Sequence, residues 1–410
     1  MKKILLATSA IGLLASAQAL AGSPSVTIGG YSDFQVGSND QAGTFDSSKR
    51  DTRFRQENEI HISAKGKTDS GLGYGAHIEL FADTNFDDDS GASGTTENGN
   101  AEKAYLYVES GFGRLELGSN GDAADALRVD ASTFARATGG VGGDWYRYVE
   151  LDNNPGTGSH TAGNGALFYA VPGLPTAMNP DDILSGTYKD RAYANKITYY
   201  SPRVEGAQLG VSFTPDQGDK GNNKTNSEYS AAGVLTAPDF ENVWNIGLNY
   251  QGEIEDIAIE ASATAEWGES QAPSAGTASA NDDLSAYALG LNLSHAGVTV
   301  GGSYASVDEF GHVKTAGTEA SYYTLGAAYE NGPFGASVTY LSSEIENSAG
   351  ATLTSTDTEL TNLSIGADYQ LAPGLVPYVE VSFFETDDGS ATTTTDNDGS
   401  VFILGTEVSF

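Results

Sequence analysis

The amino-acid sequence predicts an all-β fold, namely a 16-stranded antiparallel transmembrane β-barrel with a long third loop folded into the lumen. The first observation is a series of segments, each about ten residues long, in which apolar and polar side chains alternate. The second is that tight turns and long acidic loops alternate between these segments. The third is the abundance of Gly (51 residues) and Tyr (21 residues) without a sustained helical period, which suits glycine turns and strands with aromatic ends.

The N-terminus predicts a secretory signal peptide over residues 1–21. It begins with two lysines, continues with an apolar stretch and ends in small residues. Cleavage after Ala19 and cleavage after Ala21 both fit, and Ala21 is favoured because it leaves a polar start. A membrane anchor is disfavoured because the apolar stretch is too short to span a bilayer. Residues 22–410 would then form a single barrel.

Sixteen alternating segments can be counted along the mature chain. Those before the long loop are 25–37, 53–65, 73–83, 102–110 and 113–119. Those after it are 194–201, 207–214, 243–252, 256–267, 284–295, 298–307, 320–331, 334–344, 360–371, 375–386 and 400–410. Because the number is even, both chain ends lie on the same side, and the first strand can pair with the last to leave no open edge.

Segment 256–267 shows the two faces of a strand clearly. Alternate positions carry Ile, Ala and Trp on one side and Glu, Ser and Thr on the other, and segment 360–371 repeats this pattern. The period alone also fits a soluble or adhesive β-sandwich, in which the apolar face would pack on a second sheet. Two tiers of aromatic residues favour a barrel, because such girdles bound the apolar band at both membrane interfaces. The tier near the tight turns is Tyr250, Tyr329, Phe334 and Tyr369, and the tier near the long loops is Trp267, Tyr287, Tyr304 and Tyr340.

Residues 119–190 do not continue the strand pattern. They contain one possible helical turn over 122–128 and a glycine-rich run over 139–143, and sustained alternation resumes only at Ala194. A structureless loop of this length is uncommon in a compact domain unless it has a function. A barrel of sixteen strands encloses a wide lumen, which one long loop folded inward would narrow. The sequence therefore predicts a constriction loop over 119–190.

Composition and charge exclude several classes of function. The formal net charge is −35, from 20 basic and 55 acidic residues, and phosphate binding needs a basic face, so a nucleic-acid ligand is excluded. Cysteine is absent, which excludes disulfide scaffolds and thiolate chemistry. A barrel hydrolase would need a Ser and a His with an orienting group. No His lies in such a pattern, so we expect no enzyme activity.

Three local sequences and the last residue carry a family resemblance. They are residues 68–76 (TDSGLGYGA), 110–118 (SGFGRLELG) and 195–202 (NKITYYSP), together with Phe410. In order and spacing they resemble the general diffusion porins of Gram-negative bacteria, closest to the trimeric porins of alphaproteobacteria. The resemblance covers the whole mature chain. It implies a homotrimer in the outer membrane, in contact with lipid and lipopolysaccharide, through which small hydrophilic solutes diffuse passively. It implies no required cofactor, and it implies that Phe410 is an assembly signal.

The resemblance also implies that acidic residues of the third loop oppose basic residues of the barrel wall. On segment 53–65 one face carries charged and ionisable groups, and we expect it to point into the lumen because Phe54, Ile60 and Ile62 take the other face. This inward face consists of Arg53, Arg55, Glu57, Glu59 and His61. Arg114 and Glu116 on segment 113–119 would also face the lumen.

The loop itself carries nine acidic residues against four basic ones. Asp122, Asp125 and Asp130 are the first three of these carboxylates, and we expect them at the constriction. Because an excess of carboxylates in a narrow, low-dielectric passage attracts cations, the sequence predicts a cation-preferring channel.

Two further hypotheses come from local clusters. The loop aromatics keep a substrate-specific channel, such as a sugar channel, as the alternative function, because sugars slide along aromatic ladders; these residues are Trp145, Tyr146, Tyr148, Phe168 and Tyr169. The adjacent carboxylates Asp87, Asp88 and Asp89 predict a weak Ca²⁺ or Mg²⁺ site, with a merely solvated acidic loop as the alternative. The remaining histidines, including His77 and His295, are scattered along the chain.

Overall fold

The fold was analysed in a computed structural model. The structure describes residues 24–42, 45, 50–83, 101–151, 169–177, 192–221, 240–271, 281–310, 319–346, 357–387, 389 and 396–410. The signal-peptide prediction and the proposed metal site at Asp87, Asp88 and Asp89 therefore lie outside the described residues.

The prediction of sixteen strands is confirmed. The strands are β1 (Ser25–Gln41), β2 (Thr52–Lys67), β3 (Gly73–Phe81), β4 (Ala101–Ser110), β5 (Gly113–Ser119), β6 (Asn195–Tyr200), β7 (Ala207–Asp216), β8 (Phe240–Ile254), β9 (Ile257–Ser270), β10 (Leu284–His295), β11 (Val298–Phe310), β12 (Glu319–Asn331), β13 (Phe334–Glu346), β14 (Thr358–Tyr369), β15 (Leu375–Asp387) and β16 (Asn397–Ser409). Several extend about two to four residues beyond their predicted ends on the long-loop side, as at 38–41 of β1, where both faces are polar and the alternation that marks a strand fades.

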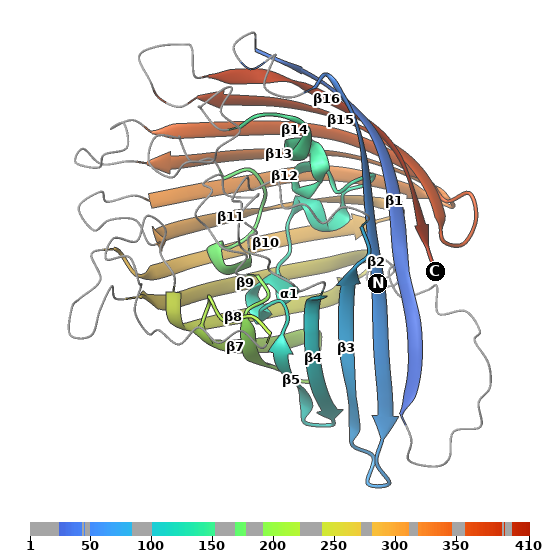
Figure 1. Ribbon diagram of the computed structural model, residues 1–410, viewed down its shortest axis with the longest axis vertical. Coiled ribbons are helices and arrows are strands. Elements are labelled where there is room, and N and C mark those ends of the chain that lie inside the picture. Colours follow the sequence, from blue (N-terminus) through green and yellow to red (C-terminus); the bar gives the residue numbers. More distant parts are fainter. Residues whose placement is uncertain are drawn as a thin grey trace.

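The strands form one closed antiparallel barrel in which each pairs with its neighbours in sequence. Closure is made by β1 and β16, which run side by side in Figure 1 with Tyr31 opposite Ser409 and Gln41 opposite Gly399. Phe410 continues this ladder, since its N–H donates to the Gly30 carbonyl and its own carbonyl accepts from the Gly30 N–H, both at 3.0 Å. The C-terminal residue is thus held at the seam of the barrel.

The two faces of the sheet are inverted relative to a soluble protein. On β14 the apolar residues Leu363 and Ile365 are exposed, whereas Asn362 and Ser364 are buried. A soluble sandwich would bury the apolar set, so this arrangement supports a barrel with an apolar outer surface and a polar interior. Seven of the eight aromatic residues assigned to the two tiers are exposed on that surface, and Tyr340 is half-buried. Among the described residues, no helix is both long and apolar enough to cross a membrane.

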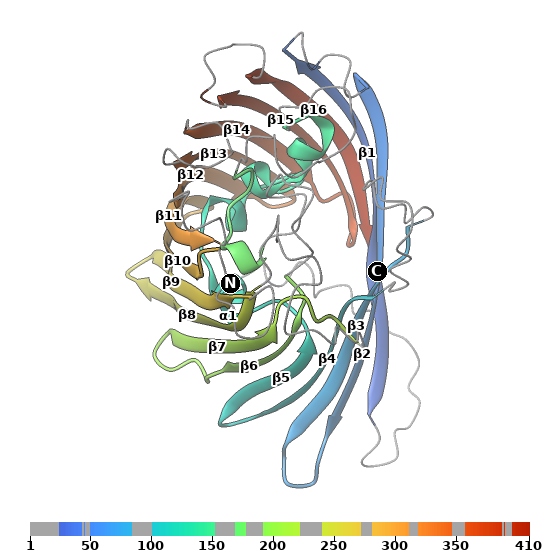
Figure 2. The same ribbon diagram turned by 60° about the vertical axis from the view of Figure 1, so that its left-hand side comes forward.

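The long segment after β5 contains one short helix and several 3₁₀ turns. They are α1 (Ala123–Leu127), η1 (Ala131–Phe134), η2 (Gly140–Gly142), η3 (Asp144–Tyr148) and η4 (Pro175–Ala177). The helical turn predicted over 122–128 is thus present. In Figure 2 these elements lie within the ring of strands. In sequence order α1 packs on β6 to β9, η1 on β11 to β13, η2 on β13 and β14, and η3 on β1 and β16.

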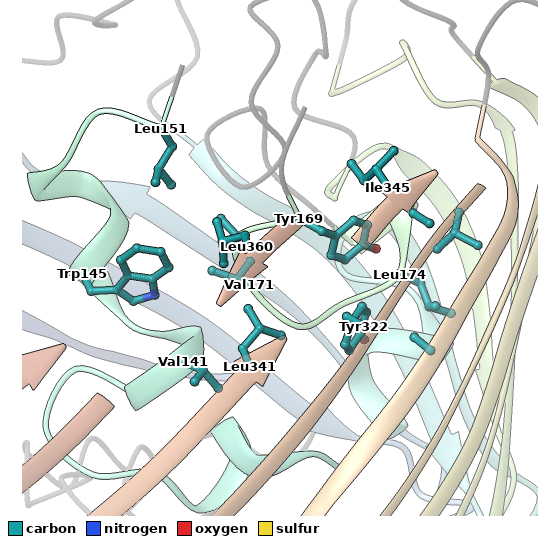
Figure 3. Packing of buried hydrophobic residues seen from close by; sticks show 14 of the residues in the cluster. Val141, Trp145, Leu151, Tyr169, Val171, Leu174, Tyr322, Leu341, Ile345 and Leu360 are labelled. Carbon is teal, nitrogen blue, oxygen red and sulfur yellow. The ribbon is translucent and has the colours of Figure 1, made fainter. Parts of the chain in front are cut away.

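The hydrophobic core lies between this segment and the wall. Val141, Trp145 and Tyr169 of the segment point toward Tyr322 and Leu341 of the wall strands β12 and β13, as Figure 3 shows. Apolar side chains on the inner face of these strands are covered by the segment rather than left to water. Their burial is therefore an energetic reason for the segment to stay inside the barrel.

Candidate functional site

The described part of the long segment, residues 120–151 and 169–177, is called the inner loop below. Its backbone is held by hydroxyl groups of the barrel wall. The wall acceptors include Ser212 for Ala123 N at 2.8 Å, Ser262 for Val129 N at 2.9 Å, Thr324 for Ala131 N at 3.2 Å, Ser337 for Arg136 N at 2.8 Å and Thr339 for Val141 N at 3.0 Å. A buried irregular backbone needs partners for its N–H groups, and this wall provides them strand by strand. The inner loop therefore follows one fixed path.

Charged side chains fix the same path at the middle of the inner loop. Arg136 donates to Glu330 of β12 at 2.6 Å and to Asp368 of β14 at 2.5 Å. Two residues later, the Thr138 hydroxyl donates to the buried Glu380 of β15 at 2.7 Å, and the Gly140 N–H donates to its other oxygen at 3.2 Å. Charge-assisted hydrogen bonds of this kind are stronger than neutral ones.

Two of the loop carboxylates expected at the constriction are buried helix caps. Asp122 is 1% exposed and accepts from the Ala124 and Asp125 N–H groups at the start of α1. Asp130 is 2% exposed and caps η1 through the Ser132 N–H. Their carboxylates are turned to the backbone of the inner loop. Burial raises the pKa of Asp122, although the nearby ammonium of Lys196 lowers it.

Asp125 is the most accessible of these three carboxylates. It forms an ion pair with Arg128 at 3.0 Å, and Arg128 also contacts Asp130 at 3.2 Å. Much of its charge is therefore balanced within the inner loop.

The inner loop meets the charged wall at Asp144. This carboxylate lies 3.3 Å from Arg55 of β2 and 3.1 Å from Arg147, and it accepts from Gln35 of β1 at 2.6 Å. Arg53 donates to the Arg147 carbonyl at 3.0 Å. Both wall arginines therefore point inward, toward the inner loop. Burial beside Asp144 raises the pKa of Tyr148 to about 12, so its hydroxyl stays neutral and donates to Gln35 at 2.8 Å.

The wall from β2 to β5 carries the other residues predicted to face the lumen. Glu57 and Glu59 both accept from the Tyr31 hydroxyl, at 2.8 and 2.9 Å, and His61 Nε2 lies 2.8 Å from Glu59. On β5, Arg114 forms ion pairs with Glu116 at 2.6 Å and Glu109 at 3.0 Å. The side chains of His61 and Arg114 keep 32% of their area exposed although they share the inward faces of their strands, so water reaches this part of the wall.

The structure adds residues to this wall that the sequence patterns did not single out. His77 and Glu79 of β3 lie beside His61, with His61 directly opposite Glu79 in the strand register. Lys103 of β4 forms an ion pair with Glu79 at 2.7 Å. A local signal was present, since Glu59-x-His61 before a tight turn is followed by His77-x-Glu79 after it, and antiparallel pairing brings such mirrored motifs together.

The aromatic residues of the inner loop serve packing. Trp145, Tyr148 and Tyr169 are 0% exposed, and Tyr146 packs against the same cluster. Trp145 stacks on Phe384 with ring centroids 5.9 Å apart, and Tyr169 stacks on Tyr322 at 5.1 Å. Phe168 lies outside the described residues. The described aromatics thus present no ladder of open ring faces to the lumen.

Comparisons with known proteins agree with this architecture. A family model described as Gram-negative porin matches residues 7–389. An uncharacterized protein of Rickettsia felis is 29% identical over 331 residues, which cover 69% of this chain and 69% of that protein. Uncharacterized protein RC0098 of Rickettsia conorii is 27% identical over 337 residues, which cover 70% of each.

Solved structures show the same fold at low sequence identity. An anion-selective porin from Comamonas acidovorans aligns with a TM-score of 0.57 and 15% identity, over 94% of this chain and 100% of that chain. OmpT, an outer membrane protein of Vibrio cholerae, aligns with a TM-score of 0.59 and 11% identity, over 96% of this chain and 99% of that chain.

Proposed function

The chain belongs to the Gram-negative porin family, and from this premise we propose that the space between its inner loop and the β2–β5 wall is the constriction of a cation-preferring channel. A member of this family is an outer-membrane barrel that lets solutes diffuse. The proposal adds that small hydrophilic solutes and ions pass along the charged side chains of β2 to β5, without any chemical reaction and without a required cofactor.

The pairing of charges on this wall carries the proposal. Arg55, Lys103 and Arg114 each contact at least one carboxylate, namely Asp144, Glu79, and Glu116 with Glu109. Glu57 and Glu59, in contrast, share a hydrogen bond from the neutral Tyr31 hydroxyl, and Glu59 also lies 2.8 Å from His61. Arg53 donates instead to the Arg147 carbonyl. The paired cations contribute little net positive field, so the carboxylates outweigh Arg53 and the narrow passage concentrates cations. The net charge of −35 adds to this field at the channel mouths.

The reversal potential in a KCl gradient across a planar bilayer tests the selectivity. We expect the wild type to prefer K⁺ over Cl⁻, and the double variant Glu57→Gln/Glu59→Gln to lose much of that preference. Asp387→Asn at the end of β15 is the matched control and should change the ratio less, because it lies at the rim. Asp122 and Asp130 are poorer targets, since both cap helices.

Salt dependence sharpens the same test. The preference should weaken as KCl rises from about 0.1 M to about 1 M, because the Debye length falls from about 10 Å to about 3 Å. A wild-type channel that prefers Cl⁻ would refute the assignment of charges and leave the family membership intact.

The assembly of the chain is a separate proposal. One similar solved structure, OmpT of Vibrio cholerae, is described as a trimer form. We propose that this chain also forms a homotrimer in contact with outer-membrane lipid and lipopolysaccharide, and that Phe410 at the barrel seam contributes to its assembly. A specific sugar channel is not favoured, because the described loop aromatics are packed in the core.

A further inference from the structure

The inner wall carries a mixed cluster of imidazole and carboxylate groups at the β2–β3 hairpin. One ligand atom each of Glu59, His61 and Glu79 lies within 4.8 Å of the others. His77 Nε2 lies 2.9 Å from Glu79 Oε1, and the rings of His61 and His77 are 5.9 Å apart. A tetrahedral site with bonds of about 2.0–2.1 Å places its ligand atoms roughly 3.3 Å apart. The ligand atoms of Glu59, His61 and Glu79 are therefore near that spacing, and His77 lies next to Glu79.

We propose that Glu59, His61 and Glu79, with His77 as the fourth ligand, bind a divalent transition-metal ion of the Zn²⁺ class on the wall of the passage. Imidazole nitrogen combined with carboxylate oxygen suits Zn²⁺ and its neighbours, whereas Ca²⁺ and Mg²⁺ prefer oxygen ligands alone. The site differs from the predicted Ca²⁺ or Mg²⁺ site at Asp87, Asp88 and Asp89, in both place and chemistry.

The surroundings hold three of the four ligands by their other polar atom. Glu59 keeps Oε2 beside His61 while its Oε1 accepts from Tyr31 at 2.9 Å. Glu79 keeps Oε1 beside His77 while its Oε2 binds Lys103 at 2.7 Å. In His77, Nδ1 lies 2.8 Å from the Ser63 hydroxyl, which leaves Nε2 directed at Glu79. Metal ligands are commonly oriented by such outer partners, so this arrangement is independent support for a site.

The local charge also favours a cation. Two carboxylates and the ammonium of Lys103 sum to −1 when the imidazoles are neutral. A bound divalent ion would change this to +1 within the passage. It would therefore bind favourably and at the same time oppose the passage of K⁺, because it reverses the sign of the charge at the wall.

Titration calorimetry of the detergent-solubilised full chain with ZnCl₂ tests binding directly. His61→Gln and Glu79→Gln should each weaken binding at this site by at least about 10-fold. His295→Gln is the matched control, because His295 is exposed at a tight turn and bonds the Asp256 carbonyl. Acidic loops that bind Zn²⁺ weakly would contribute equally to all variants. Equal Zn²⁺ affinity in the wild type and both ligand variants would overturn the inference.

The electrical test rests on the proposed channel function. Micromolar ZnCl₂ should lower the conductance of wild-type and His295→Gln channels, EDTA should restore it, and His61→Gln channels should not respond. CaCl₂ at the same concentration should have no such effect. If His61→Gln fails to fold, the same conductance measurement on Glu79→Gln tests the proposal. Channels that conduct but ignore Zn²⁺ would overturn the metal site as a regulator of the passage, whereas absence of any conductance would overturn the proposed function and leave calorimetry to decide the site.

Discussion

The inner wall of the barrel consists of two unlike halves built on the same strand pattern. From β2 to β5 the inward positions carry arginine, glutamate, histidine and lysine. From β7 to β15 many of them carry serine, threonine, asparagine and glycine, with apolar residues such as Tyr322 and Leu341 packed against the inner loop and isolated carboxylates such as Glu266 and Glu380. The first half leaves charged side chains such as Arg114 partly accessible to water, and the second half is covered by the inner loop. Alternation alone thus makes a barrel, whereas the chemistry of the inward side chains in each half decides where the inner loop packs and where the passage remains.

The largest expected effect comes from filling the space where the inner loop touches the half of the wall from β7 to β15. At Gly290 of β10 an added Cβ would lie 1.6 Å from the Val129 carbonyl oxygen, so the loop backbone would have to move. Gly290→Ala should therefore destabilise the barrel by about 1–3 kcal/mol, as overpacking does, and should change the single-channel conductance. Thermal unfolding in detergent and planar-bilayer recording measure the two effects.

Gly111→Ala is the control for this substitution, because a Cβ there meets nothing within 4 Å. Both proteins should reach the outer membrane in similar amounts. If Gly290→Ala kept the wild-type conductance and melting temperature, the inner loop would not lie against β10 as described.

The difference between the two halves also shows what the sequence could predict. The strands were found because a period of two is local, and each tight turn fixes the pairing of its own hairpin. The same local period assigns the charged residues of β2 to one face. The path of the inner loop could not be predicted, because the sequence around Gly290 does not indicate that the Val129 backbone packs against it. That contact depends on barrel closure and on residues far apart in the chain.

The roles of single carboxylates were harder to predict for a second reason. Asp122 and Asp130 were expected at the constriction because they are charged residues of the loop. Aspartate is also a preferred helix N-cap, and in both places the capping role places the carboxylate against backbone N–H groups. Asp144 has the same residue type without that capping role, and it is the one that reaches Arg55. Residue type alone does not distinguish the two roles.

An intermediate effect is expected where an ion pair holds the inner loop to the half of the wall from β7 to β15. Arg136→Met removes the partner of Asp368, whose side chain is only 11% exposed, and leaves its carboxylate poorly solvated. The loss of stability should be on the order of 2 kcal/mol, below the value for a fully buried pair. The ion pair with the more exposed Glu330 should contribute little. The current noise of the open channel should rise, because the inner loop becomes more mobile without this ion pair.

A second substitution separates the charge from the packing. Adding Asp368→Asn to Arg136→Met should recover part of the lost stability, because no unpaired carboxylate remains while the Ala137 N–H keeps an acceptor. A double variant less stable than Arg136→Met alone would show that the Asp368 carboxylate contributes through the backbone contact rather than through Arg136.

The smallest expected effect concerns the cap of α1. Asparagine caps a helix as well as aspartate does, so Asp122→Asn keeps the hydrogen bonds of the cap and removes a buried charge. Burial raises the pKa of Asp122 in the folded protein, with Lys196 opposing it, so folding favours the protonated carboxyl. The stability that this preference contributes is complete below the unfolded pKa of about 3.9 and is lost as pH rises through the folded pKa. Asp122→Asn should therefore melt slightly higher than the wild type at pH 7, and the gap should close on acidification. Asp122→Ala, which lacks the cap, should melt lower at every pH, by about 1 kcal/mol in stability. If Asp122→Asn melted lower than the wild type at pH 7, attraction to Lys196 rather than burial would govern this carboxylate.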